Sequence, residues 1–215
     1  MTRLLAKELR LALHPTNIIF LALSLLLLIP NYPYLITFFY TSLGIFFLCQ
    51  NGRENKDIYY SLLLPLRKRD IVQARVLLIV LIELAQVLIA IPAALIRNAL
   101  PLGSNMVGID ANLAFFGFAF IMMGLFNLVF ITRYYHNVNK IGGPFVISCV
   151  VMFLFITIIE TACHVIPYFR MVLDTPDPLY LAPKLTVLLV GIVIFLLLTL
   201  LAYRRSAASF EQLDF

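Results

Sequence analysis

Long apolar runs, separated by short polar segments, dominate this chain. Lipid offers no partner for charges or for unpaired backbone groups, so such runs favour membrane-spanning helices. The first two runs are shorter than the roughly 20 residues of an ordinary span. We expect an all-α polytopic membrane protein in which residues 1–215 form one transmembrane domain with six transmembrane helices, over residues 17–30, 34–49, 71–96, 111–132, 141–159 and 185–203.

The N-terminal segment has an amphipathic pattern. Arg3, Lys7 and Arg10 recur at helical steps on one stripe, and leucines recur on another. This predicts a helix over residues 1–14 that lies in the membrane interface. A basic start before an apolar run also outlines a signal peptide, but bulky residues and prolines over 29–34 replace the small-residue cleavage pattern. We expect the segment to be retained.

Composition excludes an ordinary soluble domain. Hydrophobic residues make up 62% of the chain and charged residues 13%, against roughly half and a quarter in soluble proteins. The formal charge of +5 would suit nucleic acid only if the basic residues shared one face of a folded domain, and they are scattered between apolar blocks. We expect membrane lipid, and no nucleic acid, as a partner.

The distribution of basic residues predicts the orientation. With six spans, all but three of the 16 Lys and Arg residues fall on the side that holds both termini. Arg97, Arg170 and Lys184 fall on the other side. Because short cytoplasmic loops are rich in Lys and Arg, both termini are predicted to be cytoplasmic. We expect a multi-pass protein of the cell membrane, in a bacterial plasma membrane. Residues 160–184 then form an extracellular cap.

Several kinds of chemistry are missing from the sequence. None of the nine glycines is followed by Lys, so the chain lacks a P-loop, and it has no H-E-x-x-H or G-x-S-x-G motif. Glu160, Cys163 and His164 share a helical face, but this fragment is too small for a metal site. An intramembrane enzyme would have only Glu160 and His164 as a reactive pair. We expect no catalytic residues and no metal or cofactor bound by this chain.

The connection over residues 50–70 is the longest one predicted on the cytoplasmic side. Residues 55–64 have room for about three helical turns before Pro65 ends the element. A basic run, Arg67 to Arg69, then marks the membrane boundary. A short helix held between two spans is a feature that a soluble partner can grip, although the loop also has the simpler interpretation of a tether between spans two and three.

This loop carries a family resemblance. The run LPLRKRDIVQARVL over 64–77, preceded by Arg53-Glu54-Asn55-Lys56-Asp57, resembles the coupling segment of type-2 ABC exporter permeases. The opening LLAKELR over 4–10 resembles the cytoplasmic elbow helix of the same family. Arg67 departs from the pattern, which has a small capping residue at that place. The layout matches along the whole chain, and the motifs cover about 35 residues.

The resemblance implies a half-transporter. Two six-span permeases, alike or different, would pair as a homodimer or heterodimer, and two copies of a separate ABC ATPase subunit would dock beneath them. ATP and Mg would bind to that ATPase. The coupling helix of this chain would transmit ATPase closure, and the implied ATPase-coupling residues are Arg53, Glu54, Asn55, Asp57, Tyr59 and Tyr60.

Polar residues inside the predicted spans are the next candidates, because such groups are costly in lipid and face a protein interior or a cavity. Glu83 and Gln86 form a polar stripe in span three, and Asn127 lies in span four. They would line the substrate path, or Glu83 would lock span three to Asn127. Small residues of span four, such as Gly117 and Gly124, indicate close packing within the chain or a dimer seam.

The expected substrate follows from the family resemblance rather than from particular residues. Short members of the resembled family include exporters of phenol-soluble modulins and other antimicrobial peptides, so the resemblance favours a hydrophobic or amphipathic peptide. A lipid or hydrophobic drug would suit the sparsely charged interior equally. The alternative from another class is a substrate-binding membrane subunit of a vitamin importer, which has a similar length but gives no reason for the pattern of residues 50–75.

Overall fold

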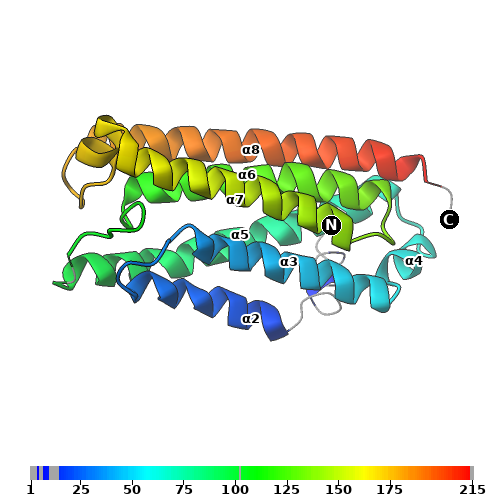
Figure 1. The fold of residues 1–215 in the computed structure, drawn as a ribbon. Helices are drawn as coiled ribbons and strands as arrows, with labels where there is room; N and C mark the ends of the chain where they lie inside the picture. The colour runs from blue at the N-terminus through cyan, green and yellow to red at the C-terminus, as the bar shows by residue number, and fades with distance from the viewer. Residues whose placement is uncertain (1–3, 5–6, 10–14, 102, 214–215) are drawn as a thin grey trace.

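The computed structural model describes residues 4, 7–9, 15–101 and 103–213, and its long helices run roughly along one axis (Figure 1). The described residues are helical or irregular and include no strand. In chain order the elements are α2 (Pro15–Ala22), the 3-10 helix η1 (Leu23–Leu28), α3 (Ile36–Glu54), α4 (Asp57–Leu62), α5 (Lys68–Ala99), α6 (Leu113–His136), α7 (Gly142–Val165), the π-helix η2 (Phe169–Leu173) and α8 (Leu181–Glu211).

Among the described residues, four helices are long and apolar enough to cross a membrane. They are α5, α6, α7 and α8, and they correspond to the predicted spans three to six. The segment Thr16–Leu28 is a shorter apolar helix, and α3 ends in the polar residues 50–54. The all-α membrane fold is therefore confirmed, whereas membrane crossing by the first two predicted spans stays a prediction.

The helix boundaries differ from the predicted ones. Two of the four candidate spanning helices, α5 and α8, exceed the predicted span at both ends, and α8, predicted over 185–203, reaches Glu211. Helices α6 and α7 begin one or two residues after the predicted start and extend beyond the predicted end. Residues 50–54 and 160–165, predicted to lie in the coupling loop and the cap, are helical. Hydropathy marks where a chain leaves lipid, but a helix continues until a cap or a breaker stops it. Helix α6 has such a cap at its N-terminus, where the Asn112 side chain accepts the Phe115 N–H at 3.1 Å.

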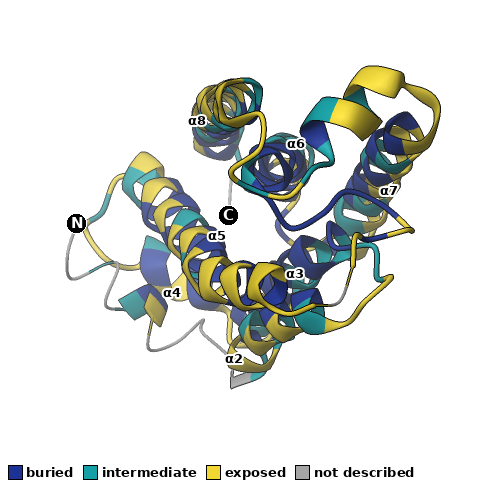
Figure 2. Cartoon of the chain, turned by 90° about the vertical axis from the view of Figure 1, so that its left-hand side faces the viewer, coloured by how far each residue is buried: buried dark blue, intermediate teal, exposed yellow. Residues whose placement is uncertain are grey.

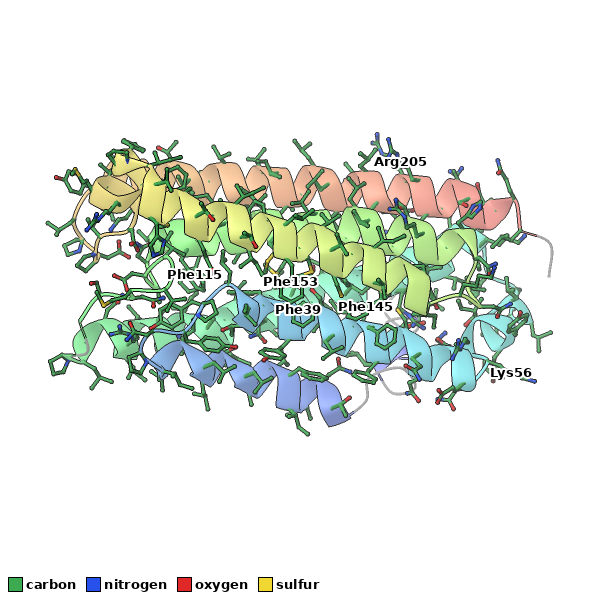
Figure 3. The ribbon with its side chains drawn as sticks, viewed as in Figure 1. Phe39, Lys56, Phe115, Phe145, Phe153 and Arg205 are labelled. Atoms are coloured by element: carbon green, nitrogen blue, oxygen red, sulfur yellow. The ribbon has the colours of Figure 1, made fainter. Side chains whose placement is uncertain are left out.

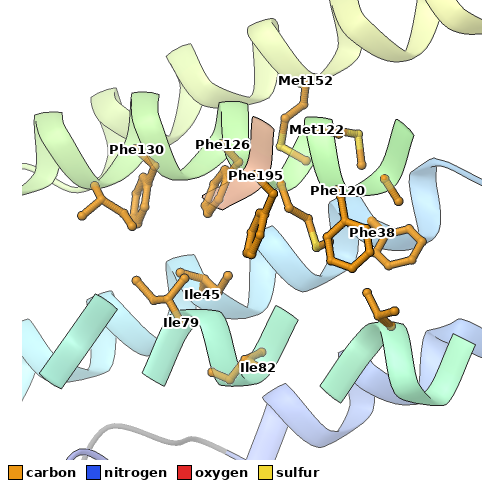
Figure 4. Packing of buried hydrophobic residues seen from close by; sticks show 14 of the residues in the cluster. Phe38, Ile45, Ile79, Ile82, Phe120, Met122, Phe126, Phe130, Met152 and Phe195 are labelled. Atoms are coloured by element: carbon orange, nitrogen blue, oxygen red, sulfur yellow. The ribbon is translucent and has the colours of Figure 1, made fainter. Parts of the chain in front are cut away.

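Helix α6 forms the centre of the bundle. Of its most apolar window, 78% is buried, compared with 22% for α7 and for α8 (Figure 2). Its aromatic side chains pack against those of α3, α7 and α8; Phe120, for example, lies with its ring centroid 5.6 Å from that of Phe195 (Figure 4). The exposed faces of α7 and α8 are apolar, which suits contact with lipid.

Both described ends of the chain lie at the α4 end of the bundle. Lys7 contacts Asp57 of α4, and Lys68 donates to the Leu213 carbonyl at 2.6 Å. Residues 7–9 are helical, and the rest of the predicted interfacial helix lies outside the described residues, apart from Leu4. The opposite end is closed by the loops after η1, α5 and α7.

Candidate functional site

The α3–α4–α5 corner is built by local turn chemistry. Helix α3 ends at Glu54, and the Asn55 side chain donates to the Asn51 side chain one turn back. Lys56 then adopts a left-handed conformation, φ 51°, which redirects the chain into α4. Figure 3 places Lys56 at this tip of the molecule. The predicted three-turn helix was therefore too long: α4 has six residues, and Arg53 and Glu54 belong to α3.

Four charged side chains meet behind α4. Asp57 Oδ1 lies 2.6 Å from Lys7 Nζ, and its other oxygen pairs with Arg75 of α5. Arg75 Nε in turn lies 2.5 Å from Glu8 Oε2, and Glu8 pairs with Lys7 at 2.9 Å. Lys7 also donates to the Ser61 hydroxyl at 2.6 Å. We call Lys7, Glu8, Asp57 and Arg75 the ion network.

The ion pairs of the network form a ring, their charges cancel, and three of the four side chains are almost inaccessible to solvent. It contains two cations and two carboxylates, and the Glu8, Asp57 and Arg75 side chains are at most 3% exposed. Removing one member would leave the other three with an uncompensated buried net charge, which costs about 3–5 kcal/mol. A Cβ at Gly52 would lie only 3.1 Å from the Arg75 guanidinium, so the α3 backbone also borders this cation. The network therefore joins residues 7–8, α4 and α5 into one unit.

The six implied coupling residues fall into two groups. Asp57 is buried in the ion network, whereas Arg53, Glu54, Asn55, Tyr59 and Tyr60 are exposed. Arg53 donates to the Asn139 carbonyl at 3.3 Å, and the Asn139 side chain donates to the Tyr59 hydroxyl at 3.4 Å, so the corner also touches the α6–α7 loop.

Sequence reasoning missed the ion network as a unit. Arg75 and Glu8 were noted only as parts of motifs. One signal was available: Arg75 stands four residues inside an otherwise apolar stretch, where an unpaired charge would be costly.

The outward face of α4 and the turn after it are apolar. Tyr60 is 57% exposed and Leu63 is 83% exposed, with Tyr59 and Leu64 beside them. Large apolar side chains clustered on a polar end of a protein mark an interaction surface. We call Tyr59, Tyr60, Leu63 and Leu64 the α4 patch.

The sequence model of the family described as ABC-2 family transporter protein matches residues 3–211. This chain belongs to that family. No curated protein and no solved structure matches it. ABC-2 proteins are membrane components of transporters and are not themselves catalytic, and membership implies partnering with an ABC ATPase.

Glu83, Gln86 and Asn127, the polar residues of the predicted spans, form hydrogen bonds inside the bundle of this ABC-2 protein. Asn127 Nδ2 donates to Glu83 Oε2 at 2.9 Å and to Thr199 Oγ1 of α8 at 3.1 Å. Gln86 instead donates to Ser24 of η1 at 2.7 Å. The suggested Glu83–Asn127 contact between α5 and α6 is therefore present. Gln86, predicted on the same stripe, connects α5 to η1 instead.

Glycines let α6 and α8 of the ABC-2 protein touch. A Cβ at Gly117 would lie 2.6 Å from the Val187 carbonyl oxygen, and one at Gly191 would lie 2.2 Å from the Gly117 carbonyl oxygen. Gly124 likewise approaches the α8 backbone at Phe195. Of the two interpretations of the small-residue stripe, packing within the chain is the one that these contacts support.

The opposite end of the ABC-2 protein offers no metal centre within the described residues, because no group of three metal-ligating side chains meets there. Both ring nitrogens of His164 contact backbone carbonyls, those of Glu160 at 2.8 Å and Met106 at 3.1 Å. His164 and Cys163 border a cavity of about 350 Å³ together with Arg170 and Asp174. These contacts tie α7 to the α5–α6 loop.

Proposed function

We propose that this ABC-2 protein is the permease subunit of an ATP-driven exporter that moves a hydrophobic or amphipathic substrate outward by alternating access. The observation that carries the proposal is the ion network, which attaches α4 to α5 at the end of the bundle where the α4 patch is exposed.

The α4 patch is the docking surface in this proposal. Tyr and Leu side chains would enter an apolar groove of the ATPase, and Arg53, Glu54 and Asn55 would form its polar rim. Aromatic anchors surrounded by a polar rim are the usual composition of such interfaces. Asp57 does not touch the ATPase in this scheme, because its carboxylate is occupied by Lys7 and Arg75.

Movement of α4 would reach the membrane through α5. Separating buried ion pairs is costly, so α4 and the first turns of α5 move together. Helix α5 extends for 32 residues to the far end of the bundle, where Arg97 donates to the Tyr34 hydroxyl at 2.8 Å and to the Gly103 carbonyl. ATP binding shifts this unit only if the ATPase contacts α4 differently in its ATP-bound and free states.

The assembly would contain two ABC ATPase subunits, which bind ATP and Mg, and a second permease subunit, identical or different. The termini would be cytoplasmic and the host membrane a bacterial plasma membrane. A role of Glu83, Gln86 and Asn127 in the substrate path stays a prediction; their hydrogen bonds within the bundle favour a packing role.

A peptide toxin or antimicrobial peptide is the favoured substrate, with a lipid or hydrophobic drug as the alternative. Helices α5, α6 and α8 enclose a cavity of about 350 Å³ whose lining is mostly apolar, with Asn98, Asn112 and Asp177 as its polar residues. An apolar cavity with a few polar groups suits an amphipathic ligand.

Affinity purification from the native membrane tests the proposal. The tagged chain is expected to retain a P-loop ATPase, and replacement of Tyr60 and Leu63 by Ser is expected to release it. The matched control replaces Leu100 and Met106, exposed apolar residues at the opposite end. A chain that retains a small molecule and no ATPase would favour the vitamin-importer subunit instead.

A further inference from the structure

A third cavity lies at the α4 end of the bundle, between α6, α7 and α8. Its volume is about 600 Å³, within the roughly 300–1,000 Å³ range of ligand sites. It is separate from the α4 patch and shares no residue with the ion network. It is lined by Thr132, Arg133, His136, Asn137, Lys140, Gly143, Pro144, Ile147, Arg205 and Ser209.

The ionisable side chains that line this cavity are all basic. Arg133, Lys140 and Arg205 contribute three cations and His136 a fourth basic group, whereas no Asp or Glu lines it. Within the described part of the chain none of these four side chains forms a salt bridge. Figure 3 shows Arg205 in the last third of α8.

Three other cations at this end of the bundle are paired with carboxylates, whereas Lys56, Arg67 and Arg204 form no salt bridge within the described residues. Arg75 and Lys7 belong to the ion network, and Arg69 Nε lies 2.6 Å from the Glu211 carboxylate. What distinguishes the cavity is that three unpaired cations and His136 share one lining. The polar contacts inside it are weak: Arg133 reaches the Val129 carbonyl and His136 reaches the Ser209 hydroxyl, each at 3.4 Å.

The other edge of the cavity is apolar and continues onto the lipid-facing surface. Gly143, Pro144 and Ile147 form this edge at the start of α7, a candidate span. Farther along α7, Val150 and Leu154 are 54% and 59% exposed. Nothing lies within 4 Å of a Cβ built on Gly143, so the edge is open. A ligand here would meet cations at one end and a hydrocarbon surface at the other.

We propose that this cavity binds the phosphate headgroup of an anionic membrane glycerophospholipid, with its acyl chains lying along α7. Basic pockets between transmembrane helices at the cytoplasmic boundary recognise such headgroups, and Arg forms charge-assisted hydrogen bonds with phosphate oxygens. An acidic protein segment would find the same charges but would leave the apolar edge facing lipid. The site is independent of the exporter function, since it requires only the membrane.

Competition in lipid nanodiscs tests this site. The full chain is incorporated into discs that contain phosphatidylglycerol and phosphatidylcholine with the same acyl chains, and the lipids that stay bound are identified by native mass spectrometry. Phosphatidylglycerol is expected to be retained preferentially. The triple change Arg133→Gln, Lys140→Gln and Arg205→Gln is expected to weaken that preference by about fivefold for each charge, on the order of a hundredfold in total.

The matched control removes three charges from the same end but outside the cavity, by Lys56→Gln, Arg67→Gln and Arg204→Gln. It is expected to keep most of the preference. An equal loss in both triple variants would overturn the site, because it would show only a diffuse surface charge. A loss of ATPase capture in the cavity variant with an unchanged lipid preference would also overturn it, in favour of an acidic protein partner.

A charge-neutral variant keeps the test valid if the triple variants fold poorly. Gly143→Leu would add an apolar side chain at this edge, where a Cβ meets nothing within 4 Å, and is expected to reduce lipid retention. Gly142→Leu is its control, because position 142 is equally open but does not line the cavity. Equal retention in the two variants would contradict the proposed position of the acyl chains.

Discussion

Arg75 of α5 forms a buried ion pair with Asp57 of α4, and the same guanidinium pairs with Glu8. Exchange of Arg75 for Met would leave these two buried carboxylates with Lys7 as the one remaining cation of the ion network. We expect Arg75→Met to lower the free energy of unfolding by about 3–5 kcal/mol and to loosen α4. Thermal unfolding in detergent and hydrogen exchange over residues 57–62 measure the two effects.

The control for Arg75→Met is Arg69→Met. Arg69 pairs with Glu211, but its side chain is 61% exposed, and an exposed pair contributes about 0–1 kcal/mol. A similar loss in both variants would mean that burial of the ion network adds nothing.

Two variants of Glu83 distinguish a packing role of this residue from a role in the substrate path. Glu83→Gln keeps an oxygen that accepts the Asn127 amide, so we expect near-normal stability and transport if the group only packs. Glu83→Leu removes that acceptor and is expected to cost about 1–3 kcal/mol. Unfolding and substrate efflux are measured on both variants; loss of efflux in stable Glu83→Gln would assign the carboxylate to the path.

The α6–α8 contact depends on glycine. Gly191→Ala would place a methyl group against the Gly117 carbonyl, and the resulting overpacking is expected to cost about 1–3 kcal/mol. Gly142→Ala, which meets nothing within 4 Å, is expected to be neutral. The thermal midpoints of the two purified variants give the comparison, and a midpoint for Gly191→Ala equal to that of Gly142→Ala would refute the close approach.

The environment of Asp174, in the loop between α7 and α8, predicts that the stability of the fold depends on pH. Burial raises the pKa of Asp174 from about 3.8 to about 6, and the nearby Asp110 acts in the same direction, while the Asp110 N–H, His164 and Lys184 oppose the shift. A raised pKa in the folded state means that the protonated form is favoured by folding, so its contribution to stability is full below about pH 3.8 and is lost as the pH rises through about 6.

We therefore expect the thermal midpoint to rise as the pH falls from 7 to 5, and Asp174→Asn to flatten that rise. A steeper rise in the Asn variant would contradict the assignment. Asp177, on the same loop but paired with Lys184 at 3.0 Å, provides Asp177→Asn as a comparison variant.

The apolar pattern predicted the parts of the fold that lipid dictates. Predicted spans three to six correspond to helices long and apolar enough to cross a membrane, because long, predominantly apolar runs favour such helices in lipid. The pattern did not predict helix ends such as Glu54 and Glu211, because those ends depend on capping and on contacts with other elements rather than on hydropathy.

The site was predictable only in part, for a related reason. A local motif identified residues 53–60, but the ion network joins Lys7 and Glu8 to Arg75 across the fold, and only three-dimensional packing determines that pairing. The Glu83–Asn127 pair could be suggested because both residues are polar interruptions of apolar helices, whereas the Gln86–Ser24 pair involves a serine that no pattern distinguishes.

ATP hydrolysis by the reconstituted complex tests the central claim, that α4 couples this permease to an ATPase, most directly. The ATPase is assembled in proteoliposomes with wild-type permease, with Tyr60→Ser/Leu63→Ser, or with the opposite-end control Leu100→Ser/Met106→Ser. The account predicts that wild-type and control permeases stimulate hydrolysis and support substrate movement, and that the α4 variant does neither although it is folded. Full stimulation and transport by the α4 variant would contradict the account.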